Sequence, residues 1–332
     1  MTKILAIESS CDETSAAIIW NGTVLSNLIA NQSIHAEYGG VVPELASRSH
    51  QENIVPVVQT ALNKANTNLK EVDAVAVTLG PGLMGSLLVG VSFAKSLAYS
   101  LGIPLISVNH MQAHILAHFA EPPFPKFPFL CLTVSGGHTQ IVLVKDYLDM
   151  EVVGQTRDDA VGEAFDKAGK IFGLGYPAGP IIDKLAKLGQ PVIPFPEPSI
   201  DGLDFSFSGV KTAVLYHIQE NLRNNPQYIV ENINNLCCSL QTTLIHILIK
   251  KITKAAKDFS ISEIAIAGGV SANSGLRQAL QALGERNKWK TYIPKFEYCT
   301  DNAAMIGIAG YYKFLNKEFS PLDVTPAARL LF

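Results

Sequence analysis

The chain has 332 residues, of which 48% are hydrophobic and 17% are charged, so its composition excludes an intrinsically disordered protein. Its formal net charge is −3, which means that any nucleic-acid surface has to be a local patch. We expect no secretory signal and no membrane-spanning segment. The five cysteines form no CxxC pair and are typical of a reduced, cytoplasmic protein.

The first 120 residues are predicted to form an α/β lobe. Apolar runs between turn signals place its elements along the chain. These are strands at 3–7, 14–20 and 23–29, a helix at 43–65, a strand at 74–79, a helix ending near 101 and a strand at 104–108. A small polar turn at 8–13 joins the first two strands, and a glycine-rich turn at 80–86 opens the second helix.

Two histidines follow the last of these strands. His110 and His114 are four residues apart, which places both imidazoles on one face of a helix. Two imidazoles at this spacing can bind one metal ion, and ligands collect at the carboxyl ends of strands in α/β proteins. The alternative is that both are ordinary core or surface residues. His118 continues the spacing, but we expect it to be an exposed helix residue.

After a proline-rich linker at 121–128 the same order of parts returns. The elements are strands at 129–134, 139–144 and 150–155, a helical region at 158–172, a strand at 264–267, a helix from about 274, a strand at 291–294 and a helix at 303–313. We therefore predict a duplicated fold with an N-terminal lobe at 1–120 and a C-terminal lobe at 121–332, which carries an insertion near 175–240.

Paired hairpins with small polar turns, each beside a strand–glycine–helix unit, are the plan of the actin-like ATPase (ASKHA) fold, with two lobes around a central cleft. Such turns and helix N-termini can hold phosphates. Asp301 follows the last strand of the second copy as the histidines follow that of the first. Two imidazoles and a carboxylate then suit Fe(2+) or Zn(2+). The alternative for Asp301 is an ordinary helix N-cap.

Eight motifs in order resemble those of the tRNA N6-adenosine threonylcarbamoyltransferase (TsaD) family in its bacterial form. They lie at 7–14, 80–83, 109–114, 132–139, 158–167, 205–212, 268–273 and 299–305. One position departs from the family, which commonly has glycine where this chain has Ala178, before Gly179. A requirement for positive φ at that position would strain Ala178, although we expect the change to be tolerated.

The resemblance implies an acyltransferase of tRNA modification. It would move a threonylcarbamoyl group from threonylcarbamoyl-AMP to the exocyclic amine of the adenosine next to the anticodon, in tRNAs that read codons beginning with adenine. The product is threonylcarbamoyladenosine. The implied partner proteins are an inactive paralogue, TsaB, and a small ATPase, TsaE.

The resemblance also assigns site residues. A metal ion, Fe(2+) with one ion per chain or alternatively Zn(2+), is implied at His110, His114 and Asp301. The implied substrate-binding residues are Val134, Ser135, Gly136, Gly137, His138, Asp166, Gly179, Asp183 and Asn273.

The donor is a mixed anhydride of a carbamate and AMP, so its carbonyl is already activated and no covalent nucleophile is needed. The chemistry requires positioning, stabilisation of developing charge and a route for the proton of the amine. We expect backbone N–H groups of 134–138 to hold phosphate or carbamoyl oxygens. By analogy with other nucleotide sites, Asp166 and Asp183 are expected to accept ribose hydroxyls.

Other residues have two open interpretations. His138 either donates to the leaving phosphate or bonds within its own turn. Asp12 or Glu13 is a hypothesised proton acceptor. Phe205 and Phe207 either stack a base or, as we favour, anchor the insertion to the lobe.

Three alternative functions fit the sequence less well. A zinc metalloprotease needs an acid after its first histidine, and Met111 stands there. A kinase-like ATPase on the same plan would not explain the histidine pair. A non-catalytic scaffold would not need to retain both histidines and Asp301.

Overall fold

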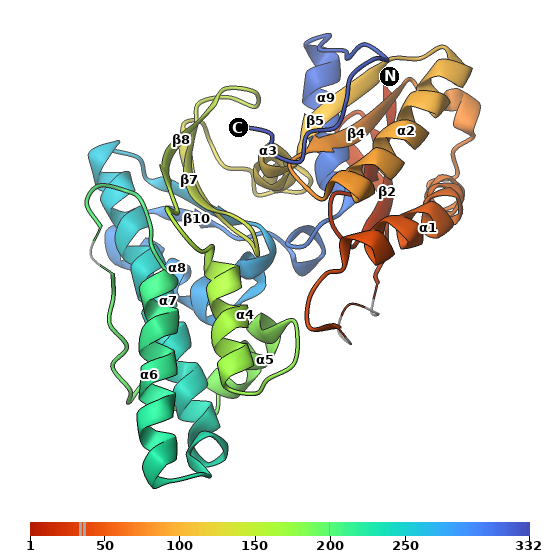
Figure 1. Ribbon diagram of the computed structural model, residues 1–332. Coiled ribbons are helices and arrows are strands. Elements are labelled where there is room, and N and C mark those ends of the chain that lie inside the picture. Colours follow the sequence, from red (N-terminus) through yellow and green to blue (C-terminus); the bar gives the residue numbers. More distant parts are fainter. Residues whose placement is uncertain (33–34, 36–37, 199) are drawn as a thin grey trace. The chain divides into compact units, whose positions relative to one another are not determined.

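The computed structural model describes residues 1–32, 35, 38–198 and 200–332, and they form two compact units (Figure 1). Unit 1 consists of residues 1–125, 146–150 and 294–332, and unit 2 of residues 126–145 and 151–293. Each unit contains one five-stranded sheet.

Unit 1 carries its helices around the first sheet. Its elements are β1 (Lys3–Glu8), β2 (Thr14–Trp20), β3 (Thr23–Ala30), α1 (Pro43–Lys64), η2 (Leu69–Glu71), β4 (Ala74–Gly80), α2 (Met84–Leu101), β5 (Leu105–Asn109), α3 (His110–Leu116), η3 (Ala117–Phe119), η5 (Phe296–Tyr298) and α9 (Ala303–Leu315). Helices α1 and α2 pack against each other, as Figure 1 shows, and α9 packs on β1 and β2.

Unit 2 repeats the pattern and contains the 31-residue helix α7. Its elements are β6 (Phe129–Val134), β7 (Thr139–Val144), β8 (Met150–Gln155), α4 (Val161–Ile171), α5 (Ala178–Ala186), α6 (Ser208–Asn224), α7 (Tyr228–Asp258), β9 (Glu263–Ala267), η4 (Gly269–Ala272), α8 (Ser274–Asn287) and β10 (Lys290–Tyr292).

The two sheets have the same topology. The strand order is β3-β2-β1-β4-β5 in one sheet and β8-β7-β6-β9-β10 in the other. In each, the first strand pairs antiparallel with its hairpin partner and parallel with the strand that follows a helical connection. The expected duplication of an α/β unit is confirmed.

The division into units differs from the predicted boundary at 120/121. The predicted boundary separates the two sheets, but residues 294–332 return to unit 1. The physical reason is the packing of α9, an apolar helix whose glycines allow close approach to the sheet. A Cβ on Gly307 would lie 2.3 Å from Ile19 Cγ1, and one on Gly310 would lie 2.6 Å from Ala76 Cβ.

The insertion in unit 2 is an extended segment and a helical pair. The segment runs along α7, where Ile193 N donates to Ser239 Oγ and Lys251 Nζ donates to the carbonyl of Ile200. Phe205 and Phe207 are fully buried in the core of the unit. They anchor the insertion, as favoured, and are not available for stacking on a base.

Helix α2 bears on the expectation that no segment crosses a membrane. Among the described residues it is the helix that is long and apolar enough to do so by length and composition. Its buried stripe, which includes Leu87, Val91 and Ala94, packs in the core of unit 1. Lys95 Nζ donates to the carbonyl of Val324 at 2.9 Å. These contacts are those of a core helix.

Candidate functional site

The histidine pair lies where β5 passes directly into α3. The N-cap of α3 is Asn109, whose Oδ1 accepts from the backbone N–H groups of Met111 and Gln112. This cap starts the helix at His110, so that His114 follows one turn later on the same face. Both histidines are buried, with 8% and 2% of their surface exposed.

Asp301 completes a three-residue cluster within unit 1. His110 Nε2 lies 3.3 Å from Asp301 Oδ1, and His114 Nε2 lies 3.2 Å from the same oxygen. The two Nε2 atoms are 3.2 Å apart, and the rings meet edge to face. The three side chains come together inside one unit, because the segment before α9 belongs to unit 1. The duplicated plan, with the histidines in the first lobe and Asp301 in the second, predicts instead that they meet across the cleft.

The competing role of Asp301 as a helix cap is filled by its neighbour. Asn302 Oδ1 accepts from Met305 N at 3.1 Å and is the N-cap of α9. The carboxylate of Asp301 is therefore directed at the histidines instead of at the helix end.

Glu8 contacts His110 at Nδ1, the ring nitrogen that does not face Asp301, and the sequence analysis did not identify it. Its Oε2 accepts from Thr78 Oγ1 at 2.6 Å and lies 3.0 Å from His110 Nδ1, and the residue is fully buried. A carboxylate on Nδ1 leaves Nε2 of His110 as the free ligand atom. The signal in the sequence was a lone acid at the end of an otherwise apolar strand.

Charges within the cluster displace the pKa values of its members. Burial lowers the pKa of His110, but Asp301 and Glu8 outweigh it and raise that pKa well above its usual value. Burial raises the pKa of Asp301, yet protonated His110 beside it holds that pKa well below the usual range. The pKa of Glu8 is lowered for the same reason. Burial lowers the pKa of His114 and keeps it neutral.

The cluster fits a divalent metal ion. Bonds of about 2.0–2.2 Å to imidazole nitrogen and carboxylate oxygen place ligand atoms roughly 3.0–3.5 Å apart around one ion. The three separations here, between 3.2 and 3.3 Å, have that size. His114 Nδ1 is buried without a hydrogen-bond partner among the described residues. Its Nε2, like that of His110, points at the shared carboxylate oxygen.

The polar turn before β2 adds two more carboxylates. Burial, together with the negative charges of Asp301 and Asp12, raises the pKa of Glu13 to about 10. In the metal-free protein Glu13 is therefore protonated at neutral pH. A protonated carboxyl can donate a proton but cannot accept one.

In unit 2 the turn at 134–138 packs tightly between two glycines. A Cβ on Gly268 would lie 2.5 Å from the carbonyl oxygen of Val134, and one on Gly162 would lie 2.6 Å from that of Ser135. Gly268 has φ +87°, so glycine is required there on both counts. His138 N donates to Ser135 Oγ at 3.0 Å, which closes the turn.

The remaining predicted substrate residues bond to helix N-termini of unit 2. Asp166 accepts from Ala178 N at 2.8 Å at the start of α5, which also contains Gly179. Asp183 accepts from Ser274 Oγ at 2.7 Å. Both carboxylates thus hold backbone in addition to any role toward a ribose. Ala178 is helical and not among the residues with positive φ, so the departure from glycine causes no strain.

Asn273 has structural partners as well. Its Oδ1 accepts from Leu276 N at the start of α8, and its Nδ2 donates to Gln241 Oε1 at 2.7 Å. His118, expected to be exposed, is buried in η3, with 6% of its surface exposed. The expectation was wrong because η3 continues the chain inward and packs under α9.

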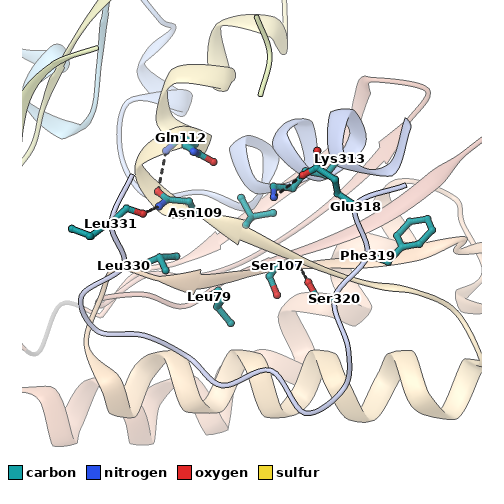
Figure 2. Close-up of a pocket in the computed structure, with 11 residues that line it drawn as sticks. Leu79, Ser107, Asn109, Gln112, Lys313, Glu318, Phe319, Ser320, Leu330 and Leu331 are labelled. Atoms are coloured by element: carbon teal, nitrogen blue, oxygen red, sulfur yellow. Dashed lines mark hydrogen bonds and ion pairs between the residues drawn. The ribbon is translucent and has the colours of Figure 1, made fainter. Parts of the chain in front are cut away.

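A cavity of about 430 Å³ opens on unit 1 beside β5 (Figure 2). Figure 2 shows the C-terminal tail looping around it, with Ser320 Oγ accepting from Ser107 N and Leu331 O accepting from Asn109 Nδ2. The lining includes Asn109 and Gln112 but none of the three clustered metal-type ligands. The cavity is therefore separate from the His–His–Asp cluster.

Comparison with known proteins gives consistent matches. The model of the family "TsaD: tRNA N6-adenosine threonylcarbamoyltransferase" matches residues 23–308. A relative of that name from Riemerella anatipestifer is 62% identical over 330 residues, which cover 98% of this chain and 97% of the relative. Another, from Christiangramia forsetii, is 61% identical over 333 residues, which cover 99% and 98%.

Solved structures resemble the chain in fold. HypF from T. kodakarensis has a TM-score of 0.61 at 12% identity, covering 98% of this chain and 50% of that one. The activator of the 2-hydroxyisocaproyl-CoA dehydratase from Clostridium difficile, with bound ADPNP, has a TM-score of 0.53 at 15% identity, covering 96% and 99%. These are actin-like ATPase folds, so the predicted fold class is confirmed.

Proposed function

The chain belongs to the tRNA N6-adenosine threonylcarbamoyltransferase family, and we propose that it performs its transfer with a metal ion held by His110, His114 and Asp301. The enzyme is a transferase whose substrate is tRNA and whose product is threonylcarbamoyladenosine. The observation that carries the proposal is the set of three ligand atoms separated by 3.2–3.3 Å.

The donor set favours Fe(2+), one ion per chain, with Zn(2+) as the alternative. Two imidazoles and one carboxylate leave open coordination positions on either metal. When bound, such an ion would supply a Lewis acid for the carbonyl or phosphate oxygens of the donor. Glu8 would hold His110 with its Nε2 lone pair directed at the ion.

We propose threonylcarbamoyl-AMP as the donor. Its anhydride carbonyl can be attacked directly by the exocyclic amine of adenosine, with AMP as the leaving group. The amine must lose a proton on attack, and Asp12 is the proposed acceptor, because burial raises the pKa of Glu13 and favours its protonated form.

Unit 2 is proposed to bind the nucleotide part of the donor. The turn from Val134 to His138 packs against the N-terminus of α4, where Gly162 N donates to the carbonyl of Ser135, and glycine-containing turns beside helix N-termini attract phosphate oxygens. Asp166 on α4 contacts the start of α5, Asp183 on α5 contacts the start of α8, and Asn273 is the N-cap of α8. The remaining oxygen lone pairs of these side chains can accept ribose or base donors.

Further proposals follow from the family. We propose the inactive paralogue TsaB and the small ATPase TsaE as partner proteins, and the cytoplasm as the location, since the substrate is tRNA and the cysteines are free.

The test combines metal analysis with single-turnover transfer from threonylcarbamoyl-AMP to unmodified tRNA, with and without the partner proteins. We expect about one metal ion per wild-type chain, and loss of both metal and transfer in His114→Ala and Asp301→Asn. His217→Asn, whose histidine bonds Tyr228 in unit 2, serves as the control. Full activity in a variant shown to be metal-free would contradict the proposal.

A further inference from the structure

The turn between β1 and β2 decides how His110 is held. Its first residues, Glu8 and Ser10, place an oxygen 3.0 Å and 3.2 Å from His110 Nδ1. Ser10 N in turn donates to Glu8 Oε1 at 2.5 Å. A displacement of this turn would therefore displace both partners of His110 together.

Two helices hold the turn at one backbone atom, the carbonyl oxygen of Cys11. His50 Nε2, on α1, lies 2.9 Å from that oxygen, and Ser86 Oγ, on α2, lies 3.0 Å from it. A carbonyl oxygen only accepts, so Nε2 of His50 carries the proton. Nδ1 of His50 then accepts from Thr14 Oγ1 at 2.7 Å, which fixes a single neutral tautomer.

Further contacts with α2 restrict movement of the turn. Leu83 N donates to the carbonyl of Ser10 at 2.7 Å, and Ser9 Oγ donates to the carbonyl of Ser86 at 3.0 Å. A Cβ on Gly90 would lie 2.2 Å from Ser9 Oγ. His50, on α1, restrains the same turn from the other side through its bond to the Cys11 carbonyl, and its side chain is fully buried. Its burial also lowers its pKa, which favours the neutral form.

We propose that His50 is a positioning residue of the transferase: by donating from Nε2 to the Cys11 carbonyl, it holds the turn where Glu8 and Ser10 orient His110. The inference rests on the proposed metal centre, since the orientation matters for a ligand. His50 acts only through the turn and lies on a helix that carries no member of the His–His–Asp cluster.

Two conservative variants separate the two bonds of His50. In His50→Gln the side-chain amide reaches the position of Nε2 and can still donate to Cys11. In His50→Asn the amide oxygen reaches the position of Nδ1 and can still accept from Thr14, but nothing reaches Cys11. His217→Asn, on α6 of unit 2, is the matched control for a helical histidine replaced by asparagine.

The readouts on the full chain are Co(2+) affinity, the visible spectrum of bound Co(2+), and the single-turnover rate constant with saturating threonylcarbamoyl-AMP and tRNA. Loss of a group that orients a metal ligand commonly costs about 10–100-fold in affinity or activity. We expect a loss of that size and an altered spectrum for His50→Asn. We expect His50→Gln to stay within a few-fold of wild type, and His217→Asn to match it.

Equal behaviour of His50→Asn and His50→Gln would overturn the proposal. Should His50→Asn fail to fold, a loss of tenfold or more in the rate constant of folded His50→Gln, which keeps the donor to the Cys11 carbonyl, would overturn the proposal. If wild type binds no Co(2+), the metal centre fails as a proposal. The ratio of the single-turnover rate constants of His50→Asn and His50→Gln still shows whether His50 positions the turn.

Discussion

His110 shows how a single side chain can carry a charge in the absence of metal. It lies between Glu8 and Asp301, at 3.0 Å and 3.3 Å, and burial alone would keep it neutral. The two carboxylates outweigh burial and raise its pKa well above 6.5. In the metal-free protein a proton therefore stands where the metal would supply the positive charge, and metal binding has to displace it.

The first prediction concerns this exchange of a proton for a metal ion. Below the raised pKa of His110, each unit increase in pH should raise the apparent metal affinity by about tenfold, because one proton is released. The dependence should extend above pH 6.5, where an unperturbed histidine would already be neutral. Calorimetric titrations with Zn(2+) in buffers of different ionisation enthalpy count the protons released.

Glu8→Gln provides the comparison. It removes one of the two charges that raise the pKa of His110, so fewer protons should be released at pH 7 and the pH dependence should shift to lower pH. Glu121→Gln, which removes a partly exposed carboxylate that contacts Lys295, should leave the titration unchanged. A pH-independent affinity in wild type would contradict the assignment of a charged His110.

At the scale of elements, the packing of α9 against the first sheet determines the position of Asp301. The helix contacts β1, β2, β4 and β5, and its N-cap, Asn302, comes directly after Asp301. The close approach depends on glycine, because side chains of the sheet fill the space that a Cβ would occupy at Gly307. A shift of this helix would move the carboxylate away from both imidazoles.

The second prediction is that Gly307→Ala destabilises the protein and weakens metal binding. The added methyl would lie 2.3 Å from Ile19 Cγ1, and overpacking of this kind typically costs about 1–3 kcal/mol. Chemical denaturation and Co(2+) titration would measure the two effects. Gly209→Ala, in α6, is the control, since its Cβ would meet only an ordinary contact at 3.5 Å from Pro198. There alanine should be neutral or slightly stabilising.

At the scale of the whole molecule, the chain's last segment returns to its first. The C-terminal tail binds the edge of the first sheet, where Ser320 N donates to Leu105 O at 2.8 Å and Ala327 N donates to Leu79 O at 2.9 Å. It also reaches the start of α2, where Gly82 N donates to Ala328 O. Unit 1 is therefore complete only after unit 2 has been synthesised.

The third prediction follows from these contacts. Truncation after Phe319 should destabilise unit 1 by roughly 2–5 kcal/mol, since it removes several hydrogen bonds worth about 0.5–1.5 kcal/mol each, those of Ser320 to β5 included. It would also uncover the edge strand β5 and promote aggregation. Thermal unfolding and light scattering would measure both. Truncation after Leu330, which removes chiefly the bond from Asn109 to Leu331, should have a much smaller effect.

Local patterns were sufficient for much of the fold and for the histidine pair of the proposed metal centre. Periodicity and turn residues predicted nearly every strand, since those signals are local, and the ordered repetition of parts predicted the duplication. The i, i+4 spacing of His110 and His114 needs only a helix to bring the imidazoles together. The duplication pointed to Asp301, and the family motifs supplied it again together with the set in unit 2.

Only the tertiary structure decided which parts share a core. That Asp301 belongs to the same unit as the histidines follows from the packing of α9 through Gly307 and Gly310, a contact between residues about 200 or more positions apart. The burial of His118, the support of His110 by Glu8 and the hold of His50 on Cys11 have the same origin. Burial and hydrogen bonding between distant segments leave no periodic trace in the sequence, because they depend on which surfaces meet.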